Sequence, residues 1–117
     1  MPVTESFIAF VVDQLAGCGL ITTKRMFGGV GVYGGELFFA LIADDLLYLK
    51  VDDSNRGDFE AAGMGPFKPY GDDREIFQYY EVPLVVLEDA DELATWARNA
   101  IRVAASKREL KHTSKRK

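Results

Sequence analysis

Cysteine and histidine are scarce in this sequence, which has one residue of each, Cys18 and His112, among its 117 residues. One cysteine cannot form an internal disulfide, and alone it cannot build a thiolate metal site. The histidine lies near the C-terminus, where no pocket is expected to hold it in a Ser-His-Asp or Cys-His catalytic arrangement. We therefore expect Cys18 to be a packing residue and His112 to be solvated, and we expect no catalytic residue, metal or cofactor.

Long hydrophobic runs are also missing. The longest apolar runs, such as residues 37–43, are far shorter than the about 20 residues that a membrane-spanning helix needs. The chain does not open with the basic, apolar and small-residue succession of a signal peptide. A cytoplasmic, reducing location without membrane contact is the simplest prediction.

Basic residues are rare except at the C-terminal end. The net charge is −4, but residues 106–117 carry six lysines and arginines against one glutamate, which leaves −9 for residues 1–105. Such an acidic body should repel nucleic acid, whereas the tail could weakly contact phosphates or an acidic protein surface. The alternative is that the tail only improves solubility. No aromatic residue lies between these charges, so the tail gives no indication of base stacking. The candidate contact residues of the tail are Lys107, Arg108, Lys111, Lys115, Arg116 and Lys117.

The length predicts one domain with its own core. The hydrophobic fraction of 48% is ordinary for a globular protein. We place the domain at residues 1–105 and treat residues 106–117 as a basic C-terminal tail.

Helical periodicity marks both ends of this domain. Thr4 is a suitable N-cap, and apolar residues at helical spacing after it predict a helix over about residues 5–16. Asp89 and Glu92 form a capping box that begins a long helix expected to pack on the sheet and to fray into the tail. The apolar stripe of this second helix is Leu93, Trp96, Ala97, Ala100, Ile101 and Ala104.

The middle of the sequence is rich in β-forming residues separated by turn signals. We predict strands at 22–27, 30–33, 37–42 and 46–51, with a tight turn at Gly34-Gly35 and another at residues 43–45. A short helix follows at 54–62, capped by Asp52 or Asp53, then at most an edge strand near 67–70 and a strand at 76–82. Adjacent strands with short connections predict an α+β fold with an antiparallel sheet flanked by helices.

Three glycines, Gly29, Gly31 and Gly34, spell the G-x-G-x-x-G pattern of a dinucleotide-binding loop, and Asp53 follows 19 residues later. That fingerprint needs a helix directly after the glycines, and the segment at 37–42 is too short for one. The favoured interpretation is that the glycines permit turns, a bulge or close backbone approach. The alternative is a small-molecule or nucleotide-binding protein that uses the Gly29–Gly34 loop.

Paired acidic residues occur at 44–45, 52–53 and 72–73. Each pair lies at a predicted turn or helix start, where carboxylates cap backbone N–H groups. The stretch DDSNRGDFE lacks the ligand spacing of an EF-hand loop. We therefore expect turn and cap roles rather than a metal site or a glycosidase pair.

Several stretches resemble the N-terminal domain of the TfoX (Sxy) family. The family's Arg-Met-Phe-Gly-Gly hallmark is present at residues 25–29, and residues 31–33 and 47–50 also match. Further on, the segments 79–83 and 87–89 match, as do Leu93 and Trp96. The similarity covers about residues 5–105. The motif residues, to which we assign a structural or interaction role, are Arg25, Met26, Phe27, Gly28, Gly29, Gly31, Tyr33 and Tyr48.

The resemblance implies a fold of the secretion-chaperone-like type, in the order helix, three strands, helix, two strands, helix. It also implies a bacterial regulator of natural competence that acts as a coactivator with the cyclic-AMP receptor protein, with no catalytic residue or cofactor. Competence regulators of this family carry a second, helical domain, whereas only the basic tail follows residue 105 here, so we expect a stand-alone N-terminal domain.

The sequence therefore predicts a non-enzymatic regulatory domain that acts by protein–protein contact. A sheet covered by helices on one face cannot hide all of the aromatic residues, so some should line an exposed apolar face. We expect that face to support a homodimer or a contact with a protein of the transcription machinery. The basic tail would add a weak nucleic-acid contact.

Overall fold

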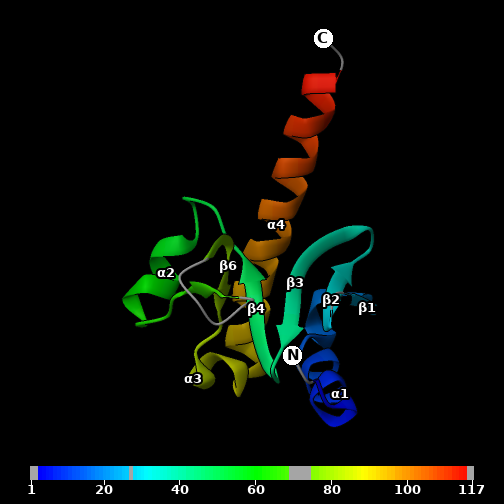
Figure 1. Cartoon of the computed structure of the whole chain (residues 1–117), viewed down its shortest axis with the longest axis vertical. Coiled ribbons are helices and arrows are strands. Elements are labelled where there is room, and N and C mark those ends of the chain that lie inside the picture. Colours follow the sequence, from blue (N-terminus) through cyan, green and yellow to red (C-terminus); the bar gives the residue numbers. More distant parts are fainter. Residues whose placement is uncertain (1–2, 27, 69–74, 116–117) are drawn as a thin grey trace.

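The computed structural model describes residues 3–26, 28–68 and 75–115, with side chains as far as residue 108. Its elements form an α+β fold with one six-stranded antiparallel sheet (Figure 1). In chain order they are α1 (Glu5–Gln14), the 3-10 helix η1 (Ala16–Cys18), β1 (Ile21–Met26), β2 (Gly29–Gly34), β3 (Leu37–Ala43), β4 (Leu46–Lys50), α2 (Arg56–Ala61), β5 (Pro66–Phe67), β6 (Ile76–Glu81), α3 (Leu84–Leu87) and α4 (Ala90–Lys115).

The sheet has the strand order β1-β2-β3-β4-β6-β5. The first four strands form a meander, and β6 pairs with β4 on one side and with β5 on the other. A bulge interrupts the β2–β3 ladder, because Val32 is opposite Ala40 but Tyr33 is opposite Phe38. Phe39 is the extra residue, so the alternation of faces along β3 shifts at this point.

The helices cover one face of the sheet. Figure 1 views the sheet from the opposite side, with α4 passing behind β4 and β3 and its C-terminal end extending past the strands. The main core lies between them and contains buried residues from α1, α2, α3 and α4 as well as from the strands. Its largest fully buried side chains include Phe39, Phe59, Leu15, Leu49 and Leu93.

The predicted N-cap at Thr4 is formed, and of the predicted Asp89–Glu92 capping box the Asp89 half is formed, while the Asp89 N–H donates to the carbonyl oxygen of Val86. The hydroxyl of Thr4 accepts a hydrogen bond from the backbone N–H of Phe7 at 3.2 Å and donates one to Asp45 in the β3–β4 turn at 3.0 Å. Oδ1 of Asp89 accepts from the backbone N–H groups of Asp91 and Glu92 at 3.1 and 3.2 Å. The cap at Thr4 therefore also ties the start of α1 to the sheet.

The predicted order of elements needs correction. Four strands, rather than the three implied by the family resemblance, precede α2, and the short helix α3 lies between β6 and α4. Pro83 at the end of the β6 segment is the N-cap of α3, so it starts this helix as well as ending the strand. The four-residue helix α3 is too short to show the periodicity that identifies a helix in a sequence.

Three local predictions were also wrong. The tight turn consists of Gly35 and Glu36, because Gly34 still pairs with Leu37, and only Gly35 has a positive φ, of 61°. The N-cap of α2 is Asn55 rather than Asp52 or Asp53. The last helix does not fray at the tail: α4 is helical to Lys115, across the domain boundary that we placed at residue 105. The predicted strand ends at Phe27 and at residues 69–70 lie outside the described residues.

Candidate functional site

The glycine pattern lies in a strand that is paired on both sides. Gly29, Gly31 and Gly34 all belong to β2, and after the two turn residues the chain enters β3 instead of a helix. A Cβ atom on Gly29 would lie 2.7 Å from the carbonyl oxygen of Ile42. A Cβ atom on Gly31 would lie 2.6 Å from Cε of Met26. The glycines therefore permit close approach within the sheet, and the helix N-terminus that would hold a pyrophosphate is not present at this motif.

The family-motif residues are distributed over both faces of the sheet rather than gathered in one pocket. Arg25 forms an exposed ion pair with Glu5 of α1, with 2.5 Å between Nη2 and Oε1. Met26 packs on Gly31 from the other face. Gly28 has a φ of 79°, a conformation that favours glycine. Phe27, predicted to belong to the same motif, lies outside the described residues.

The face of the sheet opposite the helices carries a second apolar cluster, which we call the open face. In the described part of the chain its members come only from strands: Tyr33, Phe38, Leu41, Ala43, Tyr48, Phe67 and Tyr79. Three of the rings form a chain of contacts across the sheet. The ring centroids are 5.2 Å apart for Tyr33–Phe38 and 5.8 Å apart for Phe38–Tyr79. Tyr48 contacts Phe67 at 4.7 Å. The predicted motif residues Tyr33 and Tyr48 thus both lie on this face.

Two tyrosine hydroxyls of the open face resist ionisation. Burial, followed by the nearby charges of Glu81 and Asp44, raises the pKa of Tyr48 to about 12. Burial, followed by Tyr33, raises the pKa of Tyr79 to about 12. Both side chains therefore remain neutral around pH 7.

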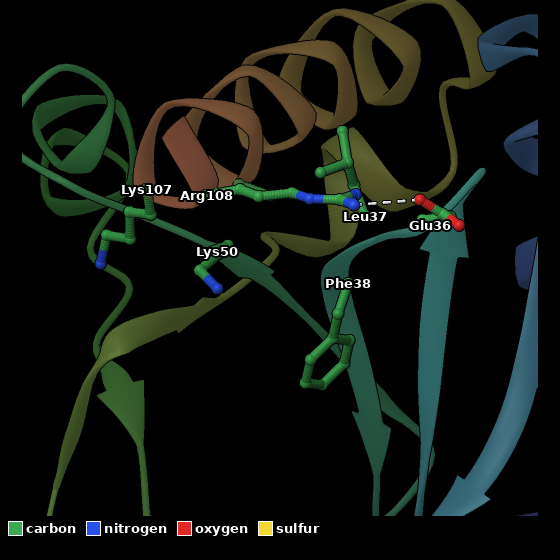
Figure 2. A pocket seen from close by; sticks show the side chains of 7 residues that line it. Glu36, Leu37, Phe38, Lys50, Lys107 and Arg108 are labelled. Carbon is green, nitrogen blue, oxygen red and sulfur yellow. Dashed lines mark hydrogen bonds and ion pairs between the residues drawn. The ribbon is translucent and has the colours of Figure 1, made fainter. Parts of the chain in front are cut away.

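At one end of the open face there is a hollow of about 240 Å³, which we call the basic hollow (Figure 2). It lies between the start of β3, the end of β4 and the C-terminal half of α4. Three cationic side chains and one carboxylate line it, together with apolar atoms. Its residues are Glu36, Leu37, Phe38, Lys50, Ala104, Lys107 and Arg108.

The charges in the basic hollow are only partly compensated. Nη2 of Arg108 donates to Oε2 of Glu36 at 3.0 Å, as the dashed line in Figure 2 marks. Among the ion pairs of the described residues, none involves Lys50 or Lys107. The ammonium group of Lys50 lies 5.6 Å from the ring centre of Tyr79. Burial, and then the positive charge of Lys107, lower the pKa of Lys50.

The structure brings two residues of the predicted basic tail to this hollow. Lys107 and Arg108 lie on α4 beside the sheet. The backbones of Lys111 and Lys115 continue α4, but their side chains lie beyond those described, and Arg116 and Lys117 lie outside the described residues. Lys50 and Glu36 were missed as site residues. The alternation of β4 places Lys50 on the same face as Tyr48, but no sequence signal links it to a residue on α4.

The other candidate residues that the structure describes, Cys18 and the acidic pairs at 44–45 and 52–53, occupy packing, turn and hydrogen-bonding positions. Sγ of Cys18 lies 3.7 Å from the carbonyl oxygen of Ala94, and burial raises its pKa. Asp44 and Asp45 form the β3–β4 turn with φ values of 53° and 55°. Oδ1 of Asp52 accepts from the backbone N–H of Ser54 at 2.8 Å. The pair at 72–73 and the side chain of His112 lie outside the described part.

Neither a metal cluster nor a membrane-spanning helix is found among the described residues. No group of three or more histidine, cysteine, aspartate or glutamate side chains there is placed to hold a metal ion. None of the helices described combines the length and the apolar character that crossing a membrane requires.

Comparison with known proteins gives one family. The family model described as the TfoX N-terminal domain matches residues 13–104, which is most of the chain. No curated protein matches the sequence.

Proposed function

This chain belongs to the TfoX N-terminal domain family, a regulatory family with no known catalytic activity, and we propose that it regulates transcription through protein–protein contact as a homodimer. The observation that carries this proposal is the open face, a sheet surface of aromatic and aliphatic side chains to which no described helix contributes. Aromatic residues are enriched at the centres of protein interfaces.

The open face extends from its packed rings into exposed apolar side chains. Leu46 on β4 is 38% exposed, and Leu41 on β3 is half-buried. By strand alternation Leu46 lies on the same face as Tyr48, and Leu41 packs against the same cluster. Covering these side chains with a protein surface would remove apolar area from water.

The charges at the margin of the open face support a second copy of the chain as its occupant. Lys50 pairs with Tyr79 in the β4–β6 ladder, and Glu81 pairs with Tyr48. A cation and a carboxylate therefore lie next to each other on the same face. In an isologous dimer the same patch of both copies meets, so the apolar side chains between these margin charges can pack on their counterparts while the charges stay at the rim.

The contact with the transcription machinery would come from surfaces that the dimer leaves free. The basic end of α4, with Lys107 and Arg108, would supply a salt-sensitive contact to DNA or to an acidic protein surface. Deleting residues 107–117 should then abolish retention on DNA and remove its salt dependence. Unchanged DNA retention after this deletion would remove the tail from the proposal.

Sedimentation equilibrium of three proteins tests the dimer. The wild-type chain should be a dimer at micromolar concentration, and Leu46→Asp should be a monomer because a carboxylate would be buried in the interface. Val85→Asp is the matched control, since Val85 on α3 is 77% exposed and lies away from the open face, on a helix whose Val86 and Leu87 pack into the main core. It should leave the dimer intact.

Two results would overturn this proposal. A monomeric wild-type chain, or equal dissociation of the Leu46→Asp and Val85→Asp variants, would contradict the dimer. Affinity capture of the wild-type protein from its native cell should return a named component of the transcription machinery, such as an RNA polymerase subunit. A capture that contains none would contradict the regulatory contact.

A further inference from the structure

The basic hollow joins residues that are far apart in the sequence. Lys50 is the last residue of β4, whereas Lys107 and Arg108 belong to α4, more than 50 residues later. In Figure 2 the ammonium ends of Lys50 and Lys107 both point toward the lower part of the view, and Arg108 reaches past Leu37 toward Glu36. The basic tail alone lacks Lys50. The cluster of three cations therefore forms only when the chain folds.

The charge of the lining selects the charge of a ligand. The three cations, offset by the single carboxylate of Glu36, leave the lining with a net charge of +2. The pKa of Asp52 is lowered mainly by the hydrogen bond from Ser54 and to a smaller extent by the charge of Lys107, but Asp52 is not part of the lining. A dianion would neutralise the lining, whereas a monocarboxylate would leave one positive charge.

The two lysines repel each other when the hollow holds no anion. Burial lowers the pKa of Lys50, and the charge of Lys107 lowers it further. An anion between the two ammonium groups would offset this repulsion with two attractions, each in surroundings less polar than water. Like-charged groups held together by a fold are a common feature of ligand sites.

The walls of the hollow are apolar. Leu37, Phe38 and Ala104 supply them, and Phe38 is half-buried, so part of its ring remains accessible. The volume of about 240 Å³ is below the range of about 300–1,000 Å³ for drug-sized ligands. The hollow therefore suits a charged group with a small organic part rather than an extended cofactor.

We propose that the basic hollow binds the dianionic phosphate of an organic phosphate monoester, with Lys50, Lys107 and Arg108 around the phosphate and Leu37 and Phe38 against the organic part. A phosphate monoester carries a charge of about −1.5 to −2 near neutral pH. Arginine donates to phosphate oxygens in a forked geometry, and lysine adds a compact charge. A phosphodiester in DNA carries one charge per phosphate and fits the lining less well.

Calorimetric titration with phenyl phosphate tests the proposal, with benzoate as the monoanionic comparison. Phenyl phosphate should bind at about pH 7.5 with one site per chain, at least about tenfold more tightly than benzoate. Lys50→Gln and Lys107→Gln should each weaken it by about tenfold or more. Lys24→Gln, which removes an exposed lysine from β1, should not change the affinity.

Glu36→Gln gives a readout in the opposite direction. The variant removes the carboxylate that competes for Arg108 and raises the net charge of the lining, so phenyl phosphate should bind about threefold to tenfold more tightly. Binding of phenyl phosphate that is weaker or unchanged in Glu36→Gln would contradict this competition for Arg108. Because Lys107 lies on the surface of α4, Lys107→Gln remains a usable variant even if Lys50→Gln fails to fold.

Two further ligands separate the sources of the phosphate. A phosphotyrosine pentapeptide that binds more tightly than phenyl phosphate would identify a phosphorylated protein segment, and equal affinity would identify a free organic phosphate. No binding of phenyl phosphate, or equal losses in Lys107→Gln and Lys24→Gln, would overturn the proposal. So would a DNA duplex whose binding depends on these lysines while phenyl phosphate does not bind.

Discussion

Arg108 on α4 donates a hydrogen bond to Glu36 in the β2–β3 turn at 3.0 Å, across 72 residues of sequence. The side chains of both residues are largely exposed, so the pair contributes at most about 1 kcal/mol to the free energy of unfolding. Its position matters more than its energy. It holds the part of α4 that follows the core residue Ala104 against the turn of the sheet.

Glu36→Gln should therefore change local stability more than global stability. The free energy of unfolding should fall by less than about 1 kcal/mol, while amide hydrogen exchange at residues 105–112 should become several times faster. Glu88→Gln, which removes an exposed carboxylate at the end of α3, is the matched control and should change neither. Exchange at these residues that is as slow in Glu36→Gln as in the wild type would contradict this role of the ion pair.

The glycines of β2 should differ in their tolerance of alanine. Gly29→Ala places Cβ against the Ile42 carbonyl oxygen, which is fixed in the ladder, and should cost about 3 kcal/mol. Gly31→Ala meets the flexible end of Met26 and should cost about 1 kcal/mol. Gly17→Ala has open space around the new Cβ and should stay within about 1 kcal/mol of the wild type. Urea unfolding ranks the three variants, and a Gly31→Ala loss larger than that of Gly29→Ala would show that this packing is misassigned.

Asn55 is the buried polar residue that joins β4 to α2. Its amide donates to the Lys50 carbonyl oxygen at 3.0 Å, and its Oδ1 accepts from the Asp52 backbone N–H at 2.9 Å. Asn55→Ala removes both partners and should lower the free energy of unfolding by about 1–3 kcal/mol. Asn99→Ala on α4 serves as the control and should change it by less than about 0.5 kcal/mol. Equal losses in the two variants would exclude a special role for Asn55.

Tyr48 and Tyr79 on the open face predict a loss of stability in alkali. Their pKa is raised to about 12 in the folded chain from 10.0, so unfolded tyrosines lose their protons first. The folded state then binds more protons than the unfolded state between these values, and the free energy of unfolding falls as pH rises from about 10 to about 12. Below about pH 10 the contribution of these two tyrosines to the free energy of unfolding is fully present.

Urea unfolding at about pH 9 and about pH 11.5 measures this loss. Tyr48→Phe removes one of the two groups and should reduce the difference between the two values. Ultraviolet titration of the phenolate band should show Tyr48 and Tyr79 among the groups that ionise late in the folded protein. Tyrosines that all titrate near pH 10 would contradict the raised pKa values.

Local patterns were sufficient for most of the fold. The stripe of α4 faces the core as its spacing indicates, with Leu93, Ala97 and Ala100 fully buried. The alternation of β4 separates Leu49 in the main core from Tyr48 on the open face. These elements were predictable because each buries one regular face and its period can be read from consecutive residues.

The parts that were not predictable depend on contacts between distant segments. The bulge at Phe39 shifts the alternation of β3 without any glycine or proline to signal it. The length of α4 beyond residue 105 is supported by the Arg108 contact with Glu36, which sequence spacing does not reveal. The basic hollow likewise needs Lys50 and Lys107 in the same place, and only the packing of α4 on the sheet brings them there.

Strands β1 to β4 follow one another in space as they do in sequence, so each hairpin can close without waiting for the rest of the chain. Such short loops cost little chain entropy, and isolated hairpins form in about 1–10 μs. β6 reaches β4 only after residues 51–75 have been closed into a loop, and α4 follows last in the chain. We therefore expect the N-terminal meander to form the early part of the folding nucleus, with docking of α4 as the slower step that fixes the native state.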